Sequence, residues 1–256
     1  MRISIVQSNL HWEDPKANRA AFAQKIAPLA GQTDLVVLPE MFTSGFSMNA
    51  AALAEPMDGP TMQWLGDQAT RLGAAITGSF ICLENDRFYN RLIFMRPDGQ
   101  YEHYDKRHLF TLAREHETFT PGKERLITTW KGWRICPLIC YDLRFPAWGR
   151  QPKANAFDLL IYVANWPSKR GHHWRSLLPA RAIENQCFVA GVNIVGTDGA
   201  GLDYVGDSCI WDYSGQDICR LSVQPGIFTA ELDLVSMQEY RRQLAFLGDA
   251  DSLSIL

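Results

Sequence analysis

Short apolar segments rich in β-branched residues recur along the chain, and each predicts a strand. Several of them are apolar at consecutive positions, which is typical of strands that are covered on both faces. The predicted strands lie at 2–7, 34–39, 74–80, 91–97, 133–140, 158–167, 187–196, 207–215 and 226–233. We therefore expect a core built on sheets that have both faces covered.

Helical patterns separate some of these strands. One predicted helix begins with Asp14 as its N-cap and Pro15 at its first position, and a second ends at Gly73, a residue type favoured just after a helix. A third is predicted at 172–186, where apolar residues recur at helical spacing.

Two turns rich in Gly, Pro, Asp and Ser, at 97–99 and 214–215, predict antiparallel hairpins. Strands that alternate with helices and also form hairpins predict a layered α/β fold. The chain has no internal repeat, low-complexity stretch or linker, so we expect a single domain over 1–256.

Composition excludes several classes of function. The net charge of −3 gives no general attraction for nucleic acid or for an anionic membrane. No apolar stretch reaches the roughly 18 residues of a membrane span, and the first residues do not form a signal peptide. Most of the six cysteines lie in apolar segments, which is typical of reduced core thiols in a cytoplasmic protein. Cys136 and Cys140 are spaced unlike zinc ligands, so we expect no metal and no other cofactor.

Three chemically useful side chains follow predicted strands. Glu40 comes directly after an apolar strand, Cys140 ends another, and Lys106 follows the strand after the first hairpin. Singly, each has an ordinary interpretation: a solvated carboxylate, a buried thiol and a surface lysine. Together they supply a nucleophile, a base to take its proton, and a cation to stabilise negative charge. The backbone N–H of Tyr141 is a candidate second donor to an oxyanion.

The segments around these residues resemble the nitrilase superfamily of carbon–nitrogen hydrolases. They read LPEMF, YDKRHLF and CYDLRFP in chain order, and YVANWP follows downstream. The resemblance covers nearly the whole chain. It implies a four-layer α-β-β-α sandwich that assembles as a homodimer or a higher even oligomer.

The same resemblance implies roles for individual residues. Glu40 would be the general base, Lys106 the oxyanion stabiliser and Cys140 the nucleophile. The family has a further glutamate between the lysine and the cysteine. We favour Glu115 over Glu117 because Glu115 precedes a glycine by the family's spacing. Its expected task is to hold Lys106 and balance its charge.

Neighbouring residues leave alternatives open. Phe42 and Trp166 either line the substrate pocket or pack in the core. Arg144 either binds a substrate carboxylate or orients its loop through Asp142, and we favour the second role. The glycine-rich segment 196–206 lacks the spacing of a dinucleotide site and is not assigned a function.

The motifs most resemble those of bacterial ω-amidases. This implies hydrolysis of the terminal carboxamide of a small dicarboxylate monoamide, of the α-ketoglutaramate or succinamate type, to acid and ammonia through a thioester. The expected partner is a small-molecule amide alone. Alternatives are another aliphatic amidase, an amidase for deaminated glutathione, or a non-catalytic binding module on the same fold.

Overall fold

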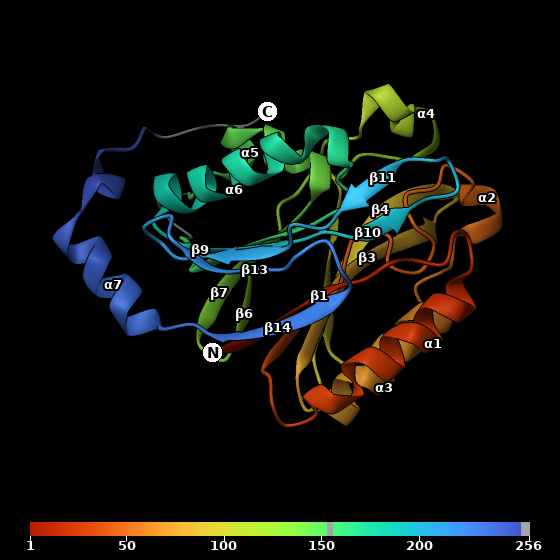
Figure 1. Cartoon of the computed structure of the whole chain (residues 1–256), viewed down its shortest axis with the longest axis horizontal. Coiled ribbons are helices and arrows are strands. Elements are labelled where there is room, and N and C mark those ends of the chain that lie inside the picture. Colours follow the sequence, from red (N-terminus) through yellow and green to blue (C-terminus); the bar gives the residue numbers. More distant parts are fainter. Residues whose placement is uncertain (153–155, 252–256) are drawn as a thin grey trace.

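The structure, a computed structural model, describes residues 1–152 and 156–251. Its core consists of two large mixed sheets (Figure 1). The first sheet runs in the order β14 (Gly226–Glu231), β1 (Arg2–Gln7), β2 (Leu35–Val37), β3 (Ala75–Glu84), β4 (Arg87–Met95) and β5 (Tyr101–Asp105). The second runs in the order β13 (Asp217–Arg220), β12 (Cys209–Trp211), β9 (Phe188–Val192), β8 (Leu159–Val163), β7 (Trp133–Ile139) and β6 (Thr128–Trp130).

Helices cover the outer face of each sheet (Figure 1). Helices α1 and α3 pack on the first sheet, and α6 packs on the second. The helices are α1 (Pro15–Ile26), α2 (Ala50–Leu53), α3 (Pro60–Leu72), α4 (Glu115–Thr118), α5 (Pro146–Gly149), α6 (Gly171–Asn185) and α7 (Leu234–Gln243). The predicted four-layer α-β-β-α sandwich is confirmed.

Alternating side chains along the strands explain why the layers form. In β1, Ile3 and Ile5 point to the core between the sheets, whereas Val6 joins the core under α1 and α3. In β2, Leu35 and Val37 likewise face the second sheet, and Val36 faces the helices. Because successive strand residues point to opposite faces, an apolar strand supplies two cores at once.

The local signals at helix and hairpin ends are confirmed. Asp14 caps α1 by accepting a hydrogen bond from the Ala17 N–H at 2.9 Å. Gly73 ends α3 in the left-handed conformation, with φ at 65°. Both predicted hairpins are antiparallel, β4 with β5 and β12 with β13.

Several predicted strands were too long: 158–167 contains only β8, 207–215 contains only β12, and a third divides in two. The segment 187–196 divides into β9 and β10 (Val195–Thr197), and β10 leaves the large sheet to pair with β11 (Asp203–Val205). The division falls at Asn193, whose side chain bonds the backbone of Trp166 through both its oxygen and its nitrogen. These bonds hold the chain at the point where it turns away from β8.

Candidate active site

The candidate residues follow strands that end at the same edge of the sandwich. Glu40 follows β2, and Cys140 and Asn165 follow β7 and β8, which are parallel neighbours. Strand β5 is antiparallel to β4, which is antiparallel to β3, so β5 runs parallel to β2 and β3. Lys106, directly after β5, therefore emerges at the edge where Glu40 lies. Each sheet contributes part of one site.

Glu40, Lys106 and Glu115 form a buried cluster. The Lys106 ammonium donates to Glu40 Oε1 at 2.8 Å and to both Glu115 carboxylate oxygens at 3.0 Å. All three side chains are fully buried. Glu117, the alternative to Glu115, is instead exposed and pairs with Arg114. The second glutamate beside the lysine is thus Glu115.

The charges of the cluster are interdependent. Burial disfavours the Lys106 ammonium, but the Glu115 and Glu40 carboxylates outweigh this and raise its pKa above its usual value. Burial also raises the pKa of Glu115; Lys106 opposes this shift, while repulsion from Glu40 adds to it. Lys106 therefore stays a cation, held between two acidic groups.

Cys140 occupies a strained turn at the edge of the cluster. It begins a 3₁₀ turn, η3 (Cys140–Arg144), with φ at 43°, a left-handed conformation that is uncommon for a residue with a side chain. The turn takes the chain sharply out of β7 and leaves the residue partly accessible. Its Sγ lies 4.0 Å from the Asn165 carbonyl oxygen.

The Cys140 thiol is held in its neutral form. Burial raises its pKa well above the usual range, and the negative charge of Glu40 adds to this, while Lys106 opposes it. A hydrogen bond with Glu40 also favours the thiol over the thiolate. The sulfur therefore needs a base at the moment it reacts, and Glu40 is the adjacent carboxylate.

Two asparagines that the sequence did not single out hold Glu40. The Asn90 amide, from the middle of β4, donates to Glu40 Oε1 at 2.9 Å. The Asn165 backbone N–H donates to Glu40 Oε2 at 2.8 Å, and its side chain donates to the Glu40 carbonyl oxygen at 2.6 Å. The carboxylate is fixed by donors from both sheets. Asn90 precedes the predicted strand 91–97 and is followed by a second polar residue, Arg91, so the apolar pattern gave no signal for it.

Asp142 braces the turn that carries Cys140. Its carboxylate accepts hydrogen bonds from the Tyr104 hydroxyl at 2.6 Å and from the backbone N–H groups of Ile139 and His108 at 3.1 and 3.0 Å. Arg144, which we expected to orient the loop through Asp142, has a different position. Its guanidinium carbon lies 4.5 Å from the centre of the Trp166 ring, in the wall of a cavity. The loop-orienting prediction for Arg144 is wrong because other donors occupy the Asp142 carboxylate.

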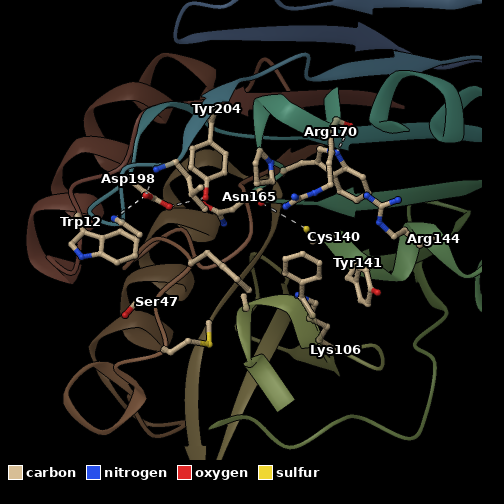
Figure 2. A pocket seen from close by; sticks show the side chains of 18 residues that line it. Trp12, Ser47, Lys106, Cys140, Tyr141, Arg144, Asn165, Arg170, Asp198 and Tyr204 are labelled. Carbon is tan, nitrogen blue, oxygen red and sulfur yellow. Dashed lines mark hydrogen bonds between the residues drawn. The ribbon is translucent and has the colours of Figure 1, made fainter. Parts of the chain in front are cut away.

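The cavity above Cys140 has a volume of about 270 Å³ (Figure 2). Lys106, Tyr141 and Trp166 line it beside Cys140. Phe42 does not line it: its ring packs in the core under α3, 5.6 Å from the ring of Trp64. The preceding residue, Met41, turns the chain with φ at 43° and directs the next side chain away from the site. Phe46 takes the place in the cavity wall, with its ring centre 5.1 Å from the Lys106 ammonium.

The hairpin of β10 and β11 forms the far wall. Asp198 and Tyr204 from this hairpin lie opposite Arg144 in Figure 2, near Trp12. This is the glycine-rich segment to which the sequence assigned no function. In the ranges 1–152 and 156–251, no cluster of three or more His, Cys, Asp or Glu side chains could hold a metal ion.

The chain matches a known family over most of its length. The model described as carbon-nitrogen hydrolase covers residues 2–242. The chain belongs to the carbon–nitrogen hydrolase family. This hydrolase is 43% identical to the ω-amidase YafV of Escherichia coli K12 over 256 residues, which cover all of this chain and 98% of the relative. It is 34% identical to the 2-oxoglutaramate amidase of Bacillus subtilis 168, with 96% of each chain covered.

A solved structure agrees with the fold of this hydrolase. XC1258 from Xanthomonas campestris, a CN-hydrolase superfamily protein, superimposes with a TM-score of 0.98 at 48% identity, covering 100% of this chain and 99% of the other. That structure carries an arsenic adduct in its active site. In the hydrolase described here, no helix among the described residues has the length and apolar character needed to cross a membrane.

Proposed function

We propose that this carbon–nitrogen hydrolase is an amidase that converts a small dicarboxylate monoamide, of the 2-oxoglutaramate or succinamate type, to the acid and ammonia. The observation that carries the proposal is the arrangement of Cys140, Glu40 and Lys106: Lys106 donates a hydrogen bond to Glu40, and Lys106 and Cys140 line the same cavity. The names of the E. coli and B. subtilis relatives support the class of substrate.

In the first half of the reaction, Glu40 takes the thiol proton as Cys140 Sγ attacks the amide carbon. The carbonyl oxygen becomes an oxyanion, stabilised by the Lys106 ammonium and the Tyr141 backbone N–H. Glu40 then gives its proton to the leaving nitrogen. The carbon–nitrogen bond breaks, ammonia leaves and a thioester remains on Cys140.

In the second half, water replaces ammonia. Glu40 takes a proton from the water, whose oxygen attacks the thioester carbon, and Lys106 again stabilises the oxyanion. The carbon–sulfur bond breaks, the sulfur recovers the proton from Glu40, and the free acid leaves. Glu115 contributes by holding the Lys106 ammonium through two hydrogen bonds of 3.0 Å. Trp166 shapes the cavity wall.

A direct test compares ammonia release from succinamate, butyramide and a short nitrile. Succinamate and butyramide have nearly the same shape and differ in charge at the far end. We expect kcat/KM for succinamate to exceed that for butyramide by about tenfold to a hundredfold, since hydrogen bonds to charged groups are stronger than neutral ones. Equal turnover of butyramide, or a nitrile as the best substrate, would refute the assignment.

The proposal extends to assembly and location. We propose one domain over residues 1–256 that forms a homodimer or a higher even oligomer. The resemblance to the nitrilase superfamily, whose members assemble in this way, supports a contact between copies. Six free cysteines support a reducing, cytoplasmic location. Light scattering that gives a monomer at micromolar concentration would contradict the assembly.

A further inference from the structure

Two arginines face the cavity from adjacent turns. Arg144 ends η3, the turn that begins with Cys140, and Arg170 ends η4 (Ser168–Arg170), just before α6. Both line the cavity. Figure 2 shows them on the side of Cys140 and Tyr141, with Asp198 on the opposite side. The sequence had offered Arg144 as one alternative for binding a carboxylate, and had offered nothing for Arg170.

Aromatic rings hold both guanidinium groups in place. The guanidinium carbon of Arg144 lies 4.5 Å from the ring centre of Trp166, and that of Arg170 lies 5.2 Å from the ring centre of Phe110. The Trp166 indole N–H also donates to the Arg170 carbonyl oxygen at 2.8 Å, so the ring on which Arg144 stacks is anchored to the turn that carries Arg170. Stacking occupies the face of a guanidinium, whereas its N–H donors lie in its plane and stay available to a ligand.

Neither arginine has a counterion within the described ranges. No ion pair there includes Arg144 or Arg170, although Arg144 donates to the His173 ring nitrogen at 3.1 Å. Burial lowers the pKa of Arg144, and the positive charge of Arg170 lowers it further. Two neighbouring cations that lack an anion are unfavourable in a partly enclosed site, so an anionic ligand would bind there favourably.

The carboxylates around the cavity cannot serve as this anion. Asp198 accepts hydrogen bonds from two backbone N–H groups of its own hairpin and from the Tyr204 hydroxyl at 2.8 Å. Glu40 and Glu115 are bound to Lys106. The anion that the two arginines require must therefore come from outside the described part of the chain.

We propose that Arg144 and Arg170 together bind the distal carboxylate of the substrate, and that Arg170 sets the preference for acidic over neutral amides. This inference rests on the proposed function, which it deepens by assigning the subsite. The arrangement puts the subsite next to the nucleophile, because Arg144 stacks on Trp166 and the preceding residue, Asn165, contacts Cys140 Sγ through its carbonyl oxygen. That proximity suits a short acyl chain.

The kinetic test uses Arg170→Met, which keeps the length of the side chain and removes its charge. We expect kcat/KM for succinamate to fall about tenfold to a hundredfold, mainly through KM, and kcat/KM for butyramide to stay within about twofold. Lys169→Met is the matched control, since Lys169 is the neighbouring exposed cation and lies outside the cavity wall. Equal losses for both substrates, or the same loss in Lys169→Met, would overturn the subsite.

A binding measurement separates the subsite from the chemistry. Cys140→Ala protein should bind succinamate in calorimetry, and Cys140→Ala/Arg170→Met protein should bind it about tenfold or more weakly. If no amide is hydrolysed but this difference is found, the proposed function fails and the anion subsite stands. If wild-type protein hydrolyses succinamate and neither kcat/KM nor binding depends on Arg170, the subsite fails and the amidase stands.

Discussion

Replacing Lys106 with methionine tests both the charge balance of the site and its catalytic use. Methionine fills a similar volume but removes an ammonium that makes three hydrogen bonds to Glu40 and Glu115. Two buried carboxylates would then lie together without a cation. Removing one partner of a buried ion pair costs about 3–5 kcal/mol, a large part of the roughly 5–15 kcal/mol that stabilises a typical domain.

We therefore expect Lys106→Met to lower the free energy of unfolding by about 3–5 kcal/mol in urea titrations followed by tryptophan fluorescence. The double variant Lys106→Met/Glu115→Gln should recover a large part of that loss, because the amide removes one of the two uncompensated charges. Lys131→Met is the control: Lys131 pairs with Asp34, but its side chain is about half exposed, so the expected loss is about 1 kcal/mol or less.

Turnover should behave differently from stability. Loss of an oxyanion donor reduces kcat by about 10²–10³, and Glu115→Gln does not replace that donor. Both the single and the double variant should therefore stay at least about a hundredfold below wild type in ammonia release. Recovery of turnover together with stability would show that Lys106 only balances charge, and would refute its proposed contact with the oxyanion.

A labelling experiment and three further variants test Cys140 and the carboxylates of the site. Iodoacetamide should label Cys140 of the wild-type protein ahead of the other five cysteines, which are buried. Because the Cys140 pKa is raised, the labelling rate of the wild-type protein should keep rising with pH through the usual thiol range, and a plateau below pH 7 would contradict the raised pKa. Glu40→Gln removes a charge that raises this pKa, so its labelling profile should shift to lower pH. Glu115→Gln should reduce turnover about tenfold or more. Glu117→Gln should leave turnover unchanged, since Glu117 only pairs with Arg114 on the surface. If ammonia release falls in Glu117→Gln and not in Glu115→Gln, Glu115 is excluded as the residue that holds Lys106.

The sequence predicted those site residues whose positions follow from local rules of strand structure. Glu40 and Cys140 each come after an apolar strand, and α/β sheets bind ligands beyond the carboxyl ends of their strands, so each could be predicted as a site residue. That the two meet depends on how the two sheets pack together, which the strand pattern does not encode. Glu115 depended on the family resemblance, since nothing in its short helix indicates that it turns inward. The glycine that marks the family's spacing is explained by its own contacts: Gly122 donates its N–H to the Lys106 carbonyl oxygen, and a Cβ at Gly122 would lie 2.0 Å from the Asp105 carbonyl oxygen.

Other features depend on contacts that strand periodicity does not encode. Phe42 faces the core because of the left-handed turn at Met41, and no pattern in the sequence announces that turn. Arg144 lies in the cavity wall on Trp166, while Tyr104 and His108, far away in the chain, donate to Asp142. Tertiary contacts of this kind can be recognised only once both sheets are assembled.

The proposed mechanism requires that Cys140 carries the acyl group during turnover. Protein mixed with succinamate and quenched in acid during turnover should show, in peptide mass spectrometry, a succinyl adduct on the peptide that contains Cys140, and Cys140→Ala should have neither adduct nor activity. An adduct confined to Cys136, or full ammonia release by Cys140→Ala, would contradict the account.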